Sequence, residues 1–209
     1  MEKEIEEFYL DKNRKFGNSP KGVGWDDEKR AESRYEFVAN IIPKGSEVLE
    51  YGFGNGIFRH HVSSKSKKYI GVEPMKCYYE KVHSKENEFL YNTSIEHFTS
   101  EFNNKDLTFN TIGKHDWSFT VGVFALKLGI TEQEYRRFCY TSIINMLHVA
   151  EKGIVLNAFQ DAVDFKDSEQ FYFNLNHLLS FLKEMGYTRY DLFNKPSNTP
   201  FEFYLKIYK

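Results

Sequence analysis

Short apolar runs alternate with longer amphipathic segments along most of this chain. The runs expected to form strands lie at about residues 47–50, 68–73, 88–91, 117–121 and 154–157. Strands that alternate with helices build a parallel sheet that is covered on both faces. Two further apolar runs, at residues 190–193 and 203–208, flank a loop with Pro196 and Pro200, which is typical of a closing antiparallel pair. The pattern therefore predicts an α/β fold with a mostly parallel, seven-stranded sheet.

The same pattern predicts the helices in the first half of the chain. Asp26 or Asp27 can cap a helix that stops before Pro43. A shorter helix is expected at about residues 57–65. The polar passage at residues 96–116 shows no clear periodicity, and we interpret it as an insertion or long loop.

In the second half, Thr131 and Glu134 form a T-x-x-E capping box for a long helix. Gly153 is expected to end this helix. A last helix is expected at residues 168–185, with Gly186 just beyond its end.

The most specific motif is the run EYGFGNG at residues 50–56, at the end of the first expected strand. Glycines at alternate positions let the backbone turn sharply and lie close to a ligand, and the following helix offers free N–H groups. A dinucleotide loop of the form G-x-G-x-x-G needs glycine at position 57, where this chain has Ile57. What remains is E-x-G-x-G-x-G, a nucleoside-cofactor loop without the pyrophosphate pattern.

An acidic residue follows the second expected strand. The apolar run at residues 69–72 stops at Glu73. A carboxylate at the carboxyl end of a second parallel strand faces the cofactor crevice and can accept hydrogen bonds from both ribose hydroxyls. Glu73 is therefore a candidate ribose ligand, with an exposed carboxylate after a tight turn as the alternative.

The glycine run and Glu73 together resemble the cofactor motifs of class I S-adenosylmethionine (SAM)-dependent methyltransferases. The resemblance covers about residues 22–209 and implies a Rossmann-like fold, with SAM as the cofactor and S-adenosylhomocysteine (SAH) as the product. It implies one methyltransferase domain at residues 26–209, preceded by an N-terminal segment, residues 1–25, that can act as a lid. The residues it implies for cofactor binding are Glu50, Tyr51, Gly52, Phe53, Gly54, Asn55, Gly56, Glu73, Pro74, Ser94, Ile95, Thr120, Val121 and Gly122.

Weaker similarities extend the resemblance to a poorly characterised branch of small bacterial and phage-type enzymes of this class. They lie at residues 22–25, 121–124 and 156–159. Some members of such branches modify sugars or other small metabolites in surface-glycan pathways. The resemblance thus implies methyl transfer to a small-molecule acceptor. An oxygen of a sugar-like or other metabolite is the expected acceptor atom, and surface-glycan biosynthesis is a candidate pathway.

Trp25 and Asn157 are the candidate substrate-binding residues. Trp25 follows Gly22 and Gly24 and precedes a helix, so its ring could close over cofactor or substrate, with an N-terminal packing anchor as an equal alternative. Asn157 falls at the carboxyl end of the fifth strand, where the active-site groups of an open parallel sheet gather.

Methyl transfer from a sulfonium requires the acceptor atom to lie about 3 Å from the methyl carbon, so positioning supplies most of the rate. Asp161 and Asp164, which follow the fifth strand, are the candidate bases for an oxygen acceptor of high pKa. Solvated loop carboxylates are the alternative. His60 and His61 are consecutive helical residues whose side chains point about 100° apart, so no metal site is predicted.

Composition fits one ordinary folded domain, since 41% of the 209 residues are hydrophobic and charges of both signs are mixed. A net charge of −2 provides no basic field, so no nucleic-acid partner is expected. Cys77 and Cys139 are too few for a disulfide scaffold. The acidic start and the absence of a long apolar run predict a cytoplasmic protein without membrane contact. A monomer or homodimer is expected, and the sequence does not decide between them.

Two other function classes stay open. A protein or nucleic-acid methylase is disfavoured because the chain has no Pro-Pro motif after the fourth strand, no separate recognition domain and no basic stripe. A non-catalytic SAM-binding protein would keep the glycine run but lack an acceptor site.

Overall fold

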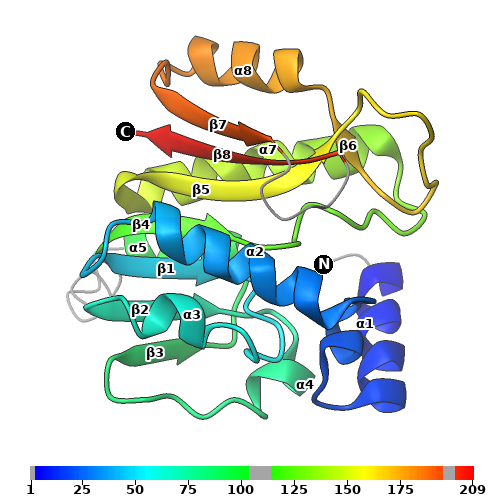
Figure 1. Ribbon diagram of the computed structural model, residues 1–209, viewed down its shortest axis with the longest axis vertical. Coiled ribbons are helices and arrows are strands. Elements are labelled where there is room, and N and C mark those ends of the chain that lie inside the picture. The colour runs from blue at the N-terminus through cyan, green and yellow to red at the C-terminus, as the bar shows by residue number, and fades with distance from the viewer. Residues whose placement is uncertain (1–2, 104–113, 195–200) are drawn as a thin grey trace.

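The computed structural model describes residues 3–103, 114–194 and 201–209, which form a mostly parallel sheet between layers of helices (Figure 1). The main path of the sheet runs in the order β3-β2-β1-β4-β5-β8-β7. All neighbours are parallel as far as β5, and β8 is antiparallel to both β5 and β7. The strands are β1 (Glu47–Tyr51), β2 (Lys68–Val72), β3 (Glu88–Tyr91), β4 (His115–Thr120), β5 (Ala150–Gln160), β7 (Tyr190–Asn194) and β8 (Glu202–Tyr208). This path confirms the predicted α/β sheet and its closing antiparallel pair.

Helices cover both faces of the sheet. In Figure 1, α2 and α3 lie in front of the central strands and α5 and α7 lie behind them. The helices are α1 (Lys3–Phe16), the 3-10 helix η1 (Pro20–Val23), α2 (Glu28–Ile41), α3 (His60–Ser63), α4 (Lys76–Tyr79), α5 (Ile95–Asn103), α7 (Glu132–Val149) and α8 (Leu175–Glu184). Within the described ranges, no helix combines the length and apolar composition needed to span a bilayer.

Successive residues of the central strands contribute side chains to two separate hydrophobic cores. Val48 and Tyr69 pack into the core beneath α2 and α3, whereas Leu49 and Ile70 pack into the core beneath α5, α7 and α8. Side chains alternate between the faces of a strand, so a strand that is buried on both sides carries apolar residues at successive positions. The continuous apolar runs that predicted these strands have this physical cause.

Two helix starts follow the predicted capping. The Asp27 side chain accepts a hydrogen bond from the backbone N–H of Arg30 at 3.0 Å and caps α2. Thr131 Oγ1 accepts from the N–H of Glu134 at 3.3 Å and caps α7, as the capping box predicts. Each cap satisfies an N–H that has no partner within its own helix.

The prediction that Gly153 ends α7 is wrong. The helix ends at Val149 because Ala150 already has an extended backbone, and β5 continues through Gly153. Gly153 has φ +149°, and a Cβ there would lie 2.0 Å from the carbonyl oxygen of Ile207 in β8. The glycine is needed for the close pairing of β5 and β8.

Two other predicted helices need correction, and one strand was not predicted. The last helix, α8, begins at Leu175 because Asn174 caps it, accepting from His177 N–H at 3.0 Å. Before it lies a short unpredicted strand, β6 (Tyr172–Phe173), which pairs with β5. The helix expected at residues 57–65 is only the single turn α3.

The passage at residues 96–116, interpreted as an insertion or long loop, contains regular structure at both ends. Its first part is α5 and its last two residues open β4, which begins before the predicted start at Trp117. The remainder, residues 104–113, lies outside the described residues.

We expect Gly153→Ala to lower the free energy of unfolding by about 3 kcal/mol or more, because the added Cβ overlaps the Ile207 carbonyl and strains the backbone. Urea unfolding followed by circular dichroism measures the loss. Gly129→Ala is the control, since Gly129 has φ +82° with no atom within 4 Å of an added Cβ. That variant should lose only about 1–2 kcal/mol. Equal losses would contradict the close approach of β5 and β8.

Candidate functional site

A cavity of about 310 Å³ lies at the carboxyl ends of β1, β2 and β4. From β1 the chain adds β2 and β3 on one side and then crosses to place β4 on the other. Ligands of open α/β sheets bind at this kind of switch point. The cavity walls come from the glycine run after β1, the end of β2, the segment after β4, the start of α7, and the N-terminal helix α1.

The glycine run forms a turn that only glycine tolerates without strain. Gly52, Gly54 and Gly56 have φ of +73°, +57° and +67°. A Cβ on Gly52 would lie 2.5 Å from a methyl of Val123, and one on Gly54 would lie 3.1 Å from a methyl of Val23. The run is therefore held tightly between the segment after β4 and the N-terminal segment.

Glu73 connects this turn to the end of β2 through hydrogen bonds. One carboxylate oxygen accepts the backbone N–H of Gly54 at 2.7 Å and the other accepts the N–H of Met75 at 2.8 Å. Burial raises the pKa of Glu73 to about 7, although both N–H groups act in the opposite direction. Each oxygen has a second lone pair, so the carboxylate can still accept hydrogen bonds from a ligand.

Glu50 lies behind the turn and is fully buried. The Tyr35 hydroxyl donates to one of its oxygens at 2.8 Å, and the Tyr69 hydroxyl donates to the other. Burial raises the pKa of Glu50 to about 7. The carboxyl thus joins α2 to β2 beneath the cavity floor, and Tyr35 is the member of this group that reaches the cavity wall.

A chain of buried polar contacts supports the turn after β4. Asn157 Oδ1 accepts the backbone N–H of Gly122 at 2.8 Å, and Asn157 Nδ2 donates to Glu202 at 2.5 Å. Arg34 Nε donates to the same Glu202 oxygen at 2.8 Å. Both ends of the Asn157 amide are therefore bound by the protein itself.

Trp25 closes one side of the cavity. The Arg34 guanidinium lies 4.7 Å from the centre of the Trp25 ring, within cation–π distance. The edge of the same ring covers Gly122, where an added Cβ would lie 2.5 Å from it. Trp25 is thus packed against its neighbours, as expected of an N-terminal anchor. It also lines the cavity, as expected of a residue that closes over a ligand.

The N-terminal segment is hydrogen-bonded over the site. The Asn55 side chain donates to the carbonyl of Ser19 at 2.7 Å. The Tyr78 hydroxyl donates to the carbonyl of Gly22 at 2.6 Å and also lies 3.0 Å from the carbonyl of Tyr9. These contacts place α1 and η1 beside α4, as Figure 1 shows.

Most of the residues predicted to bind the cofactor line the cavity. They are Tyr51, Gly52, Phe53, Gly54, Asn55, Glu73, Pro74, Ser94, Val121 and Gly122. Four others, Glu50, Gly56, Ile95 and Thr120, are buried behind the wall. The structure thus gathers these predicted residues at one place from the ends of β1, β2, β3 and β4.

The predicted bases and one predicted substrate residue are placed differently. In the described chain, Asp161, Asp164 and Asn157 are not part of the cavity wall. Asp161 accepts a hydrogen bond from the Asn174 side chain at 2.9 Å, and Asp164 is exposed. Their loop follows β5 but runs toward β6, away from the switch point between β1 and β4.

Sequence reasoning missed the wall that comes from α1 and α7. Ile5 and Tyr9 line the cavity from α1, and Glu134 and Phe138 line it from α7. Both pairs are four residues apart, which is the spacing of one helix face. That spacing was a usable signal for a shared face, but it does not reveal what the face contacts.

The cavity wall is aromatic and acidic. Glu73, Glu96 and Glu134 line it, and no Lys, Arg or His does so among the described residues. The aromatic members of the wall are Tyr9, Trp25, Tyr35, Tyr51, Phe53, Phe58, Tyr78, Tyr135 and Phe138. Such a wall favours a ligand that carries positive charge and flat rings.

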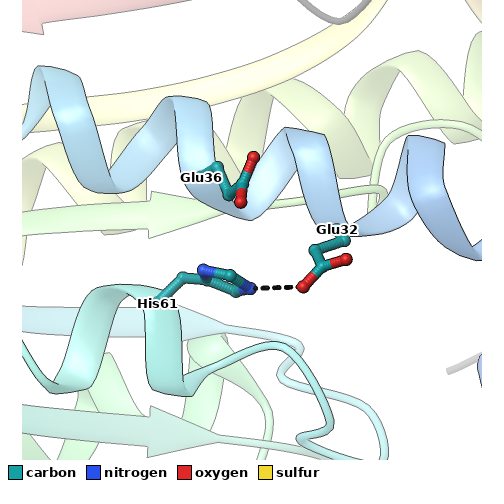
Figure 2. Close-up of side chains that lie close together, drawn as sticks. All are labelled: Glu32, Glu36 and His61. Atoms are coloured by element: carbon teal, nitrogen blue, oxygen red, sulfur yellow. Dashed lines mark hydrogen bonds and ion pairs between the residues drawn. The ribbon is translucent and has the colours of Figure 1, made fainter.

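Away from the cavity wall, Glu32 and Glu36 on α2 lie near His61 on α3 (Figure 2). One potential ligand atom from each residue lies within 4.8 Å of the others. His61 Nε2 lies 3.1 Å from a Glu32 oxygen, a contact that ties α3 to α2. This contact accounts for the cluster, and we assign no metal to it.

No model of a known protein family matches the sequence, and no curated protein matches it. Solved structures match almost the whole chain. Magnesium protoporphyrin IX methyltransferase from Synechocystis PCC 6803, with bound SAM, has a TM-score of 0.62 at 12% identity over 98% of this chain and 97% of its own. The 1,6-didemethyltoxoflavin-N1-methyltransferase from Burkholderia thailandensis, with SAH, gives 0.61 at 10% identity over 98% and 86%. A possible histamine N-methyltransferase from Thermotoga maritima gives 0.57 at 15% identity over 100% of both chains.

These similarities show that the chain has the Rossmann-like fold of class I SAM-dependent methyltransferases. The fold predicted from the glycine run and Glu73 is therefore confirmed. At such low identities the similarity concerns the fold alone, and the roles of individual residues rest on the cavity described above.

We expect Glu50→Gln to reduce the pH dependence of stability. The folded carboxyl has a pKa of about 7, against 4.5 for an ordinary glutamate. The contribution of Glu50 to stability is therefore fully present below about pH 4.5 and is lost, by on the order of 3 kcal/mol, as the pH rises through about 7. A neutral amide removes this loss and can still pair with both tyrosine hydroxyls.

Urea unfolding at about pH 5 and about pH 8 measures the effect. Glu36→Gln, on an exposed side of α2, is the control and should leave the pH dependence unchanged. A Glu50→Gln protein with the wild-type dependence would show that this carboxyl does not carry it.

Proposed function

We propose that this protein is a methyltransferase that uses SAM to methylate a small-molecule acceptor. The observation that carries the proposal is the buried Glu73 carboxylate, held by the N–H groups of Gly54 and Met75 where β1 and β2 end. It lies in the wall of a cavity at the switch point of a methyltransferase fold.

The residues of the cavity fit SAM better than they fit a dinucleotide. SAM supplies a methyl group activated by a positively charged sulfonium. The described wall offers carboxylates and aromatic rings to such a charge. A pyrophosphate would meet carboxylates but no Lys or Arg among the described lining residues, which is unfavourable in a partly dehydrated site.

Each part of the wall has a role in this proposal. Glu73 accepts hydrogen bonds from the ribose hydroxyls, and the turn at Gly52 and Gly54 lies against the cofactor. Pro74 and Ser94 border the adenine, and the turn at residues 121–122 borders the methionine end. The support that Asn157 and Glu202 give to Gly122 keeps this last turn in position.

We further propose that residues 1–25 act as a lid on the domain formed by residues 26–209. Trp25 and Tyr9 exclude water from the cavity, and the contacts of Ser19 and Gly22 with the cavity wall hold the lid closed. Methyl transfer then depends chiefly on positioning. A role for Asp161 or Asp164 as a base would require their loop to move toward the cavity.

The solved neighbours act on small molecules such as a magnesium porphyrin and a didemethylated toxoflavin, which supports a small-molecule acceptor here. An oxygen of a sugar-like metabolite, and a place in surface-glycan biosynthesis, remain predictions from the sequence. So do a cytoplasmic location and a monomeric or homodimeric state. A protein or nucleic-acid methylase and a non-catalytic SAM-binding protein are the alternatives.

We expect calorimetric titration to show micromolar binding of SAH and no binding of NAD. Gly54→Val should abolish SAH binding, because its side chain would press on Val23 across the cavity wall. Gly45→Val is the matched control, since Gly45 also has a positive φ, +79°, but has no atom within 4 Å of an added Cβ. Folded wild-type protein that binds neither ligand, or Gly54→Val with wild-type affinity, would contradict the proposal.

We expect the affinity for SAH to rise roughly tenfold between about pH 6 and about pH 8, because a carboxylate accepts hydrogen bonds more strongly than its protonated form. The pKa of Glu73 near 7 sets this window, with the neutral acid below it and the carboxylate above it. Glu73→Ala should remove the pH dependence and weaken binding by about 1.5–3 kcal/mol at high pH. Glu86→Ala, at an exposed loop position, is the control and should change neither quantity.

A further inference from the structure

We propose that the acceptor is an amine carried on an apolar, ring-containing body and bound between the segment after β4 and the start of α7. This inference rests on the proposed function and names the class of its substrate. It departs from the sugar-like oxygen acceptor expected from the sequence.

The part of the cavity that lies beyond the glycine run and Glu73 is apolar. Leu126 and Ile130 line it from the segment after β4, and Tyr135 and Phe138 line it from α7. The centres of the Tyr135 and Phe138 rings are 5.5 Å apart, and the Tyr135 hydroxyl is occupied by the Val123 carbonyl at 2.9 Å. Such a surface stabilises flat apolar groups and gives few partners to the hydroxyls of a sugar.

The segment after β4 is a fixed wall. Its backbone pairs with residues before β6, since Lys127 N–H donates to the carbonyl of Glu169 at 2.8 Å and Phe171 N–H donates to the carbonyl of Ala125 at 2.9 Å. The apolar wall therefore has a defined shape before any acceptor enters, which reduces the entropic cost of binding.

The charges on this side of the cavity are negative. Glu96 lies in the first turn of α5 and Glu134 in the first turn of α7, and both line the cavity. Glu73 and Glu96 both raise the pKa of Tyr51 after the larger effect of burial, so their fields overlap at that residue. A phosphate or carboxylate on the acceptor would find no cationic partner among the described wall residues. An ammonium would be attracted by the carboxylates and by the rings.

An amine also suits a wall whose charged groups, among the described residues, are all carboxylates, because a carboxylate can take the proton that an ammonium must lose. The bound ammonium first releases one proton to water by way of the Glu134 carboxylate, which leaves a neutral nitrogen. This nitrogen uses its lone pair to form the new C–N bond while the C–S bond breaks, and the bonding electrons remain on sulfur. The positive charge passes to nitrogen, which then releases a proton to water or to the Glu134 carboxylate. The Glu96 and Glu134 carboxylates can stabilise the cationic nitrogen before and after transfer.

The test uses three probes that share a para-hydroxyphenyl ring, namely tyramine, tyrosol and para-hydroxyphenylacetate. They end in an ammonium, an alcohol and a carboxylate, so they separate charge from shape. Methyl glucoside represents an uncharged sugar. Calorimetry with the full chain, saturated with SAH, measures binding of each probe without relying on turnover.

We expect tyramine to bind roughly fivefold more tightly than tyrosol, because the ammonium gains one favourable charge contact. We expect no binding of para-hydroxyphenylacetate or methyl glucoside at millimolar concentration. Glu134→Gln should reduce the affinity for tyramine roughly two- to fivefold and leave tyrosol unchanged. Glutamine still completes the capping box, so the helix should keep its start. Glu132→Gln is the matched control, because Glu132 lies in the same turn, pairs with Arg136 and is not part of the described cavity wall.

Tighter binding of the acid or the glucoside than of tyramine would overturn the inference. So would the absence of tyramine binding to a chain that binds SAH, or equal effects of the two glutamine variants. Folded protein that fails to bind SAH would instead contradict the proposed function, and with it this inference.

Discussion

The geometry of the site depends on the hydrogen bond between the backbone N–H of Gly54 and the carboxylate of Glu73. It joins the turn after β1 to the end of β2, and the second carboxylate oxygen fixes the chain as it leaves β2 at Met75. The turn itself needs three glycines with positive φ, a conformation that has little local preference in its favour. The Glu73 carboxylate stabilises this turn conformation by accepting the Gly54 N–H, and it does so at the cost of burying a charge.

Much of the fold could be predicted because the signals were local. The runs at β1 and β2 could be recognised because both faces of these strands are buried, and the caps at Asp27 and Thr131 lie beside the N–H groups they satisfy. Gly153 could not be interpreted from its neighbours in sequence, because the atom that demands glycine belongs to Ile207. The start of α8 was missed for a related reason, since β6 is defined by its pairing with β5.

The residues of the site also fall into two groups, those in a local sequence motif and those that only packing brings together. The glycine run and Glu73 form a compact motif whose spacing is visible in the sequence. The aromatic wall from α1 and α7 is assembled by packing between distant segments, and nothing local marks Tyr9 or Phe138 as its members. Asn157 was expected near the substrate because it lies at a strand end. Both ends of its amide are instead engaged, by Gly122 and by Glu202, which lies far along the chain.

The position of β8 has a consequence for the growing chain during synthesis. This strand is made after the other strands of the described sheet, yet it pairs along the full central stretch of β5 and brings Glu202 to Arg34 and Asn157. Until it emerges, β5 has an open edge and Arg34 lacks its buried ion pair with Glu202. A nascent chain that ends before β8 should therefore be a client for chaperones, and the cavity should reach its final shape only after β8 is added.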